Sequence, residues 1–222
     1  MPKPPNARRR GAEEKIKAAA RALFTKNGFA ATRTRDIARQ AGVNLALLNY
    51  YFGSKEELFS IIMMENYGAF LHGLSAVLNH PDTSVEAKIT AVVSAEIDLL
   101  TRQPDLPIFI LNAVVSNPGE FIRKVELDKI VKGSFLFRQI RESGGFARTA
   151  GFDPLHLIIN LVALTIAPFV MAPVIQKVTG TSRLRFKALM AERKRLIPRW
   201  LGLMADPQGN TSKRTPLNRS KG

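Results

Sequence analysis

Cysteine is absent from this 222-residue chain, and histidine is scarce, with only three residues. Without thiols, disulfide frameworks, thiolate nucleophiles and Cys-ligated zinc or iron–sulfur sites are excluded. His72, His80 and His156 are widely separated, and the chain has no metal-binding spacing, glycine-rich phosphate loop or nucleophile–base motif. We therefore expect no catalytic residues, no metal site and no cofactor, and we do not expect an enzyme.

Acidic residues are also in deficit. The 18 Asp and Glu residues face 33 Lys and Arg residues, which gives a formal charge of +15. Residues 1–58 carry +7 and residues 206–222 carry +3, so both ends of the chain are more basic than its middle. This distribution favours a polyanionic partner, either nucleic acid or an anionic membrane surface, over a basic surface that serves solubility alone.

Charge is missing altogether from residues 154–176, a stretch long enough to span a bilayer. Its polar residues His156 and Asn160, its prolines Pro168 and Pro173, and the lack of a second span argue against a membrane helix. A helix buried in a bundle or at a dimer interface explains the segment better. We expect a cytoplasmic protein without membrane contact, because the N-terminus also lacks a secretory signal. A membrane-associated helical protein is the alternative.

Alternating strand patterns are absent, whereas helical periodicity and helix caps recur along the chain. We predict an all-α protein of about nine helices. The expected helices span residues 12–27, 33–41, 45–51, 54–79, 83–102, 107–116, 117–143, 153–179 and 182–204. The expected organisation is a flexible basic arm at 1–11, a first domain at 12–58, a larger helical domain at 59–205 and a disordered tail at 206–222.

Two short helices of the first domain are joined by a tight turn that contains Gly42. Their inner faces carry the apolar residues Ile37, Ala38, Val43, Leu48 and Phe52. Together with the amphipathic helix before them they predict a helix-turn-helix, whose second short helix lies in the major groove of DNA. We expect Asn44 to cap that second helix, and Arg33 and Arg35 to lie off the apolar face of the first, near DNA.

The stretch GFAATRTRDIARQAGVNLALLNYYFGSKEELF, residues 28–59, closely resembles the DNA-binding domain of TetR-family transcriptional regulators. The resemblance covers about residues 12–60. It includes Phe29, Thr32, the Asp-Ile-Ala and Ala-Gly-Val segments around the turn, and the Tyr-Phe-x-Ser-Lys-x-x-Leu segment that ends at Leu58. Beyond residue 60 only the helical layout and the length agree with the family.

The resemblance implies roles for individual residues of the DNA-binding domain. Thr32 would cap the second helix and donate to a phosphate. Lys55, at the start of the fourth helix, would contact a phosphate with the help of the helix dipole. The recognition helix would present Leu45, Leu47, Asn49 and Tyr50. The family often has Tyr at the position of Asn49 and Thr at that of Leu47, which leaves Leu47 for contact with a thymine methyl group.

The resemblance further implies that residues 59–205 bind an effector and dimerise, with the last two helices as the dimer interface. The composition permits an apolar pocket for a small lipophilic effector. The candidate pocket residues are Phe70, Phe109, Asn112, Phe121, Phe135, His156 and Asn160. The function predicted from the sequence is a homodimeric repressor that binds a double-stranded DNA operator and is released by that effector. A DNA-binding regulator without effector control is the alternative.

Overall fold

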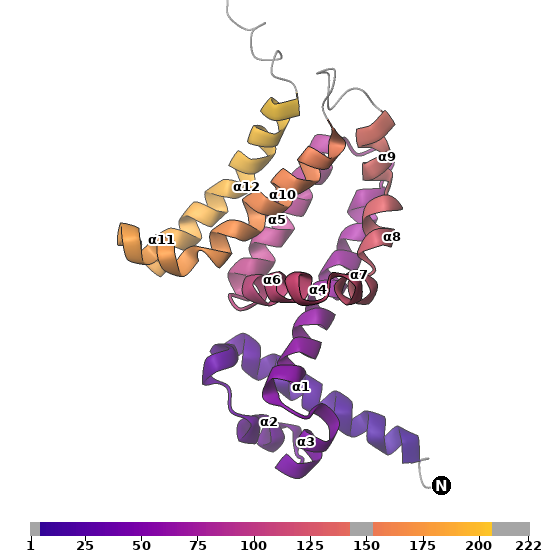
Figure 1. The fold of residues 1–222 in the computed structure, drawn as a ribbon, viewed down its shortest axis with the longest axis vertical. Helices are drawn as coiled ribbons and strands as arrows, with labels where there is room; N and C mark the ends of the chain where they lie inside the picture. Colours follow the sequence, from indigo (N-terminus) through magenta and orange to yellow (C-terminus); the bar gives the residue numbers. More distant parts are fainter. Residues whose placement is uncertain (1–4, 143–152, 206–222) are drawn as a thin grey trace, which may run out of the picture. The chain divides into compact units, whose positions relative to one another are not determined.

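The computed structural model of the chain describes residues 5–142 and 153–205, and these residues form helices and no strands. The elements are α1 (Pro5–Ala31), α2 (Thr34–Ala41), α3 (Leu45–Phe52), α4 (Lys55–Asn79), α5 (Val85–Arg102), α6 (Leu106–Ser116), α7 (Pro118–Val125), α8 (Leu127–Lys132), α9 (Phe135–Glu142), α10 (Pro154–Val170), α11 (Ala172–Thr179) and α12 (Arg183–Ala205) (Figure 1). The all-α fold is confirmed. The expected number of about nine helices was too low, because the described residues contain twelve.

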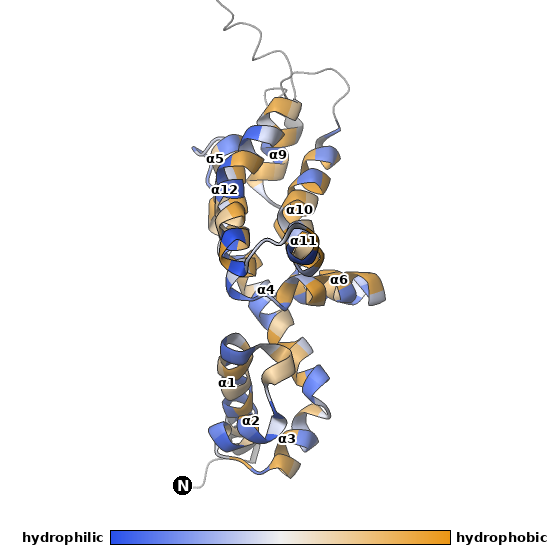
Figure 2. Cartoon of the chain, turned by 90° about the vertical axis from the view of Figure 1, so that its left-hand side faces the viewer, coloured by the Kyte–Doolittle hydropathy of each residue, from blue (hydrophilic) through white to orange (hydrophobic). Residues whose placement is uncertain are grey.

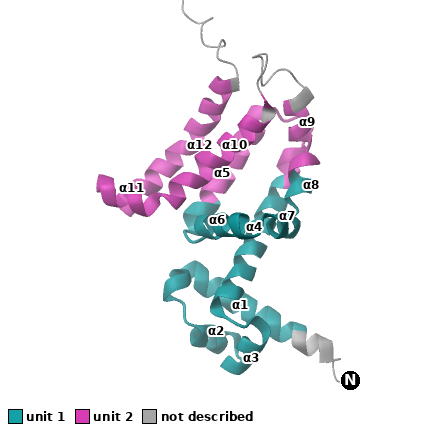
Figure 3. Ribbon diagram, viewed as in Figure 1, with its two compact units in different colours: residues 1–74, 99–130 teal, residues 75–98, 131–222 magenta. Residues whose placement is uncertain are grey.

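Two compact units make up the chain (Figure 3). Unit 1 comprises residues 1–74 and 99–130, and unit 2 comprises residues 75–98 and 131–222. Unit 1 therefore contains the whole of the expected helix-turn-helix domain together with α6, α7 and part of α4. Unit 2 contains α9 to α12 and most of α5, and helices α4, α5 and α8 contribute residues to both units.

The core of the helix-turn-helix forms as the apolar periodicity predicts. Its buried residues include Ile16, Ala19, Ala20 and Phe24 of α1, Ile37, Ala38 and Ala41 of α2, Leu48 and Phe52 of α3, and Leu58 and Ile62 of α4. These side chains recur every three or four residues, so each helix buries one stripe and leaves its opposite face in solvent. The burial of these stripes in one common core is what holds α3 in place.

The core of unit 2 is built mainly by α5 and α12, with one buried residue each from α9 and α10. It consists of Ile89, Val93, Ile97, Ile140, Leu157, Phe186, Met190, Ile197 and Leu201. Helix α10 is apolar along most of its length (Figure 2), yet it buries only one side, because Leu155, Ile159 and Val162 are each about half exposed. Burial in the core of this one chain therefore does not account for all the apolar side chains of the segment.

Residues 118–142 form three helices, whereas the sequence predicts a single helix over 117–143. Helix α7 ends at Val125, and its C-cap residue Glu126 has a left-handed φ of 52° and forms an ion pair with Lys129 at 2.6 Å. A second break lies at Ser134, whose hydroxyl donates to the Val131 carbonyl. The side-chain oxygen of Asn79 then accepts the Phe135 amide at 2.9 Å and starts α9. Because Asn79 lies 56 residues before Phe135, the local sequence periodicity could not predict this helix start.

Residues 153–179 form two helices, where one was expected. Helices α10 and α11 meet at Met171 with a bend of 60°. Pro173, in the first turn of α11, lacks the N–H that would continue α10. Neither the 17 residues of α10 nor the 8 residues of α11 reach the roughly 20 needed for a straight membrane span. The bend therefore weakens the membrane alternative for this segment.

By length and composition alone, helix α4 is also long and apolar enough to cross a membrane. Its side chains Leu58, Ile62, Tyr67 and Leu71 are nevertheless buried in the protein. Its apolar character is therefore explained by its place in the core.

The N-terminal expectation also needs correction. Helix α1 begins at Pro5, inside the segment 1–11 that was expected to be a flexible arm. The expected disordered tail, residues 206–222, lies outside the described residues.

Candidate nucleic-acid interface

The turn between α2 and α3 has the geometry that a helix-turn-helix requires. Gly42 ends α2 in the left-handed conformation with φ 68°, where a side chain would introduce strain. The side-chain oxygen of Asn44 then accepts the Leu47 amide at 2.7 Å and caps α3. The capping role expected for Asn44 is confirmed, and it fixes where α3 begins.

Helix α3 separates a buried face from an exposed one. Leu48 and Phe52 are buried, whereas Asn49 is exposed and Tyr50 is 66% exposed. Leu45 and Leu47 are half-buried. The exposed face thus offers an amide, a phenol and two apolar side chains, which are groups able to contact base edges, thymine methyl groups and phosphates.

Arginines surround this face on α2 and just before it. Arg33 and Arg35 are exposed, and neither is held by an ion pair among the described residues. Arg39, also exposed, pairs with Asp36 on the same helix at 2.7 Å. Arg33 at the N-cap of α2 and Arg35 on α2 are therefore the two arginines here whose charge no carboxylate among the described residues offsets.

Thr32 does not have the role expected from the resemblance. Helix α2 begins at Thr34 and Arg33 occupies its N-cap position without a side-chain hydrogen bond, while Thr32 is buried. The Thr32 hydroxyl lies 2.7 Å from the Gly28 carbonyl and 3.3 Å from the Leu23 carbonyl, and donates toward α1. The expected capping of α2 is wrong, because this hydroxyl satisfies the carbonyls at the end of α1.

Lys55 is also engaged within the protein. Its ammonium donates to the backbone carbonyls of Phe29 and Thr32, at 3.2 and 3.3 Å, and lies 4.1 Å from the centroid of the Phe29 ring. These contacts tie the start of α4 to the end of α1. A phosphate bound by Lys55 would share the ammonium with these carbonyls, so a phosphate contact stays a prediction.

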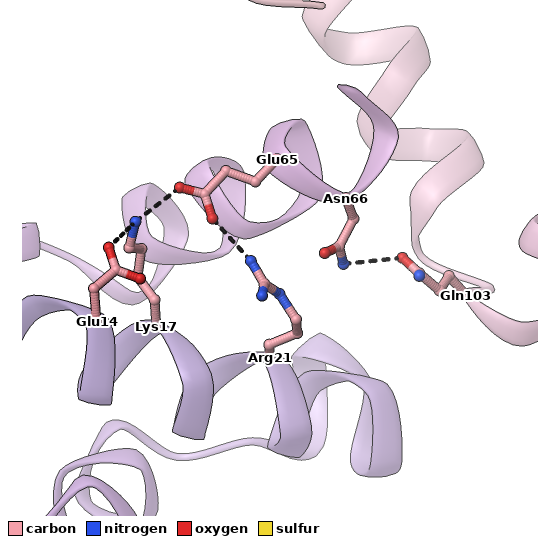
Figure 4. A network of polar contacts seen from close by, with 6 residues as sticks. All are labelled: Glu14, Lys17, Arg21, Glu65, Asn66 and Gln103. Carbon is pink, nitrogen blue, oxygen red and sulfur yellow. Dashed lines mark hydrogen bonds and ion pairs between the residues drawn. The ribbon is translucent and has the colours of Figure 1, made fainter. Parts of the chain in front are cut away.

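A polar network fixes α1 on α4 (Figure 4). Glu65 accepts from Lys17 and Arg21, both at 2.9 Å, and Lys17 also pairs with Glu14 at 2.8 Å. Burial alone would lower the pKa of Lys17, but hydrogen bonds and charge from Glu14 and Glu65 outweigh it and raise that pKa. One carboxylate on α4 thus holds two cations of α1, which sets the position of the helix-turn-helix on α4.

Asp105 is a residue that the sequence analysis missed. It precedes α6, and its carboxylate accepts the Phe29 amide at 2.8 Å. Gly28 beside it has φ 75°, and a side chain there would meet the Asp105 carboxylate at 3.3 Å. An acidic residue before a proline-rich helix start was visible in the sequence, but its partner 76 residues earlier was not. The end of α1 is thereby joined to the start of α6.

The candidate pocket residues are divided between the two units. In unit 1, Phe121 is buried and stacks on Tyr67 with ring centroids 6.0 Å apart, Phe70 stacks on the same Tyr67, and Phe109 lies edge-on to Phe59. In unit 2, Phe135 faces Lys88, and Asn160 is half-buried. 

Two polar members of the proposed pocket are not enclosed. Asn112 on α6 and His156 on α10 are both exposed, so neither is placed to orient a ligand in the interior of its own unit. Both residues were predicted to line the pocket because each is a polar residue within an apolar run. Such a run does not reveal which side of the helix faces the core.

Comparison with known proteins places this geometry in a family. The family described as bacterial regulatory proteins, tetR family, matches residues 16–61. The curated protein "Probable HTH-type transcriptional regulator YttP" of Bacillus subtilis (strain 168) is 27% identical over 168 residues, which cover 75% of this chain and 81% of that protein. The name of this relative gives it as a probable transcriptional regulator of the helix-turn-helix type.

Solved structures share the fold over nearly their whole length. A transcriptional regulator of the TetR/AcrR family from Thermobifida fusca superposes with a TM-score of 0.58 and 21% identity, covering 86% of this chain and 97% of that one. The regulator FadR from Bacillus subtilis, crystallised with stearoyl-CoA, gives a TM-score of 0.55 at 19% identity, covering 83% and 97%. The similarity thus extends well beyond the helix-turn-helix.

Proposed function

Because the chain belongs to the TetR family of transcriptional regulators, we propose that it is a homodimeric repressor released from its operator by a small lipophilic effector. The observation that carries the proposal is the capped helix α3, with Asn49 and Tyr50 exposed and with Arg33 and Arg35 free of ion pairs beside it. Family members bind DNA and act as dimers, so two copies of α3 would enter successive major grooves about 34 Å apart.

The proposed dimer interface lies on α10, α11 and α12, the segments expected as the last two helices. It is supported by the exposed apolar residues Leu155, Ile159 and Val162, which recur at helical spacing along one side of α10. A contiguous apolar surface of this kind is typical of a protein interface. A second copy would cover it and would explain the uncharged segment 154–176.

Release by an effector is supported by the likeness in fold to FadR, which was crystallised with stearoyl-CoA. An effector that binds better to a conformation with wrongly spaced recognition helices lowers operator affinity. Linkage then requires DNA to weaken effector binding by the same factor. The Asp105–Phe29 hydrogen bond gives movements of α6 a direct route to α1.

Selection of bound fragments from genomic DNA, followed by footprinting, tests the proposal. We expect a two-fold symmetric footprint whose half-sites are about one helical turn apart. A set of fragments without shared sequence would refute a sequence-specific regulator. An operator affinity that no added small molecule changes would refute the effector and favour a regulator without effector control.

The arginine positions permit a sharper test with a matched control. If each protomer neutralises about four phosphates, the dimer has a log–log salt slope of roughly −7. Arg35→Ala should weaken operator binding and reduce that slope by about 2 per dimer, one for each copy. Arg123→Ala removes an exposed arginine from α7, outside the helix-turn-helix and the proposed dimer interface, and should leave the slope unchanged. Equal effects of the two variants would contradict the proposed DNA face.

A further inference from the structure

Helix α5 carries two buried ionisable side chains that DNA binding does not use. Lys88 has no exposed surface and Glu96 is 4% exposed, and both belong to unit 2. Burying a charge is strongly unfavourable unless an opposite charge or hydrogen bonds compensate it. The contacts around Lys88 therefore show whether the chain itself supplies that compensation.

The ammonium of Lys88 contacts only uncharged groups of the protein. It donates to the side-chain oxygen of Gln139 at 2.5 Å and lies 4.7 Å from the centroid of the Phe135 ring. The amide nitrogen of Gln139 donates to the Thr83 carbonyl at 3.3 Å, which turns the Gln139 oxygen toward Lys88. An ammonium has three N–H donors, and this arrangement gives it one strong acceptor.

No carboxylate in the described part of unit 2 pairs with Lys88. Asp98 is paired with Lys194 on α12. Glu96 interacts with Thr165 and lies eight residues along α5, which is roughly 12 Å along the helix axis and too far for an ion pair. The Phe135 ring, which Lys88 contacts, also lies 5.3 Å from the guanidinium carbon of Arg138, measured to the ring centroid. Arg138 therefore adds a second positive charge near Lys88.

Among the described residues, the surroundings of Lys88 thus lack one anion. Burial lowers the pKa of Lys88, as desolvation of an ammonium without a counter-ion must. Val85, three residues before Lys88 on α5, and Leu136, next to Phe135 on α9, are apolar and pack against the core of the same unit. A positive centre inside an apolar environment matches a ligand with an acidic group on an apolar body.

We propose that unit 2 binds a lipophilic carboxylic acid whose carboxylate pairs with Lys88 between α5 and α9. The inference rests on the proposed effector control and assigns a chemical class to the effector. The carboxylate takes the place of the Gln139 oxygen as acceptor, and the apolar body packs against Val85 and Leu136. Helix α9 has only eight residues and follows the break at Ser134, so a small local opening exposes Lys88.

Binding of decanoate and of 4-phenylbutyrate to the full chain tests the inference, measured by calorimetry and by the shift in Tm without DNA. We expect each acid to bind at least ten times more tightly than its methyl ester or the corresponding alcohol. Equal affinity for acid and ester, or no binding of either acid, would overturn the inference.

Two variants of the site separate a ligand contact from a structural role. Lys88→Met replaces a buried charge by an apolar side chain of similar length, so we expect an unchanged or higher Tm and at least tenfold weaker acid binding. Gln139→Glu supplies a carboxylate from the protein and should weaken acid binding through competition. Lys194→Met, which breaks the pair with Asp98, is the matched control and should bind the acids like the wild type. Wild-type affinity in both site variants would overturn the inference.

Operator binding distinguishes this inference from the function on which it rests. If the acids bind and Lys88→Met abolishes their binding while no operator exists, the site stands and the repressor proposal fails. If the operator is bound but the acids are not, the repressor proposal stands and the Lys88 site is refuted.

Discussion

Glu96 makes the stability of unit 2 depend on pH in a way that one substitution removes. Its carboxyl group is almost fully buried, and it interacts with the buried hydroxyl of Thr165 on α10. Burial raises the pKa of Glu96 from 4.5 to about 7, although the hydrogen bond with Thr165 opposes part of this change. The folded protein therefore keeps this proton at pH values at which the unfolded chain has lost it.

The sign and size of the effect follow from linkage. Between pH 4.5 and pH 7 the unfolded chain releases the proton and the folded chain retains it, so the free energy of unfolding falls as pH rises. A difference of about 2.5 in pKa corresponds to about 3 kcal/mol, all of it lost once the pH exceeds the folded value. Below pH 4.5 both states are protonated and Glu96 has no effect.

Glu96→Gln keeps the shape and the hydrogen-bonding capacity of the neutral acid and cannot ionise. The variant should match the wild type at pH 4.5 and exceed its free energy of unfolding by up to about 3 kcal/mol at pH 8. For a chain of this length that is about 6–12 °C in Tm. Urea titrations followed by circular dichroism from pH 4.5 to 8.5 measure the difference directly.

A matched control removes an exposed carboxylate from the same unit. Glu192→Gln, on the surface of α12, should change the free energy of unfolding by less than about 0.5 kcal/mol without a trend in pH. The reasoning fails if the difference between Glu96→Gln and wild type does not depend on pH, or if the variant is less stable at pH 8.

Three further substitutions concern the helix-turn-helix. Asn44→Ala removes the cap of α3 and should lower the free energy of unfolding by about 1 kcal/mol in urea titrations, together with operator affinity. Asp105→Asn weakens the bond to Phe29 and should lower stability by about 1 kcal/mol; unchanged hydrogen exchange of the Phe29 amide would contradict this. Thr32→Val should lower stability by about 1–2 kcal/mol and leave the salt slope of operator binding unchanged, whereas a shallower slope would show a phosphate contact.

The sequence was sufficient for the helix-turn-helix because its signals are local. The cap by Asn44, the left-handed Gly42 and the buried stripe through Ile37 and Leu48 all act within a few residues, and the structure has each of them. Thr32 is the exception. The hydroxyl of a threonine between two helices can accept from an amide of the second helix or donate to a carbonyl of the first. The Thr32 hydroxyl donates to the Gly28 carbonyl of the first helix.

Longer-range features were out of reach of the sequence pattern. The break before α9 depends on Asn79, and the end of α1 depends on Asp105, so both partners are more than 50 residues away in the chain. The exposure of two candidate pocket residues could not be predicted for a related reason. Apolar composition identified α6 and α10 as helices rich in core residues, but the exposure of Asn112 and His156 depends on which side of each helix packs.

The composition of unit 1 has a practical consequence for building chimeric sensors. Sequence similarity invites a graft of the helix-turn-helix at residue 61, where the family match ends. Such a transplant would separate Lys17 and Arg21 from Glu65, and Phe29 from Asp105. A DNA-reading module exchanged between regulators therefore needs residues 1–74 together with 99–130, and the crossover points belong inside α4, α5 and α8.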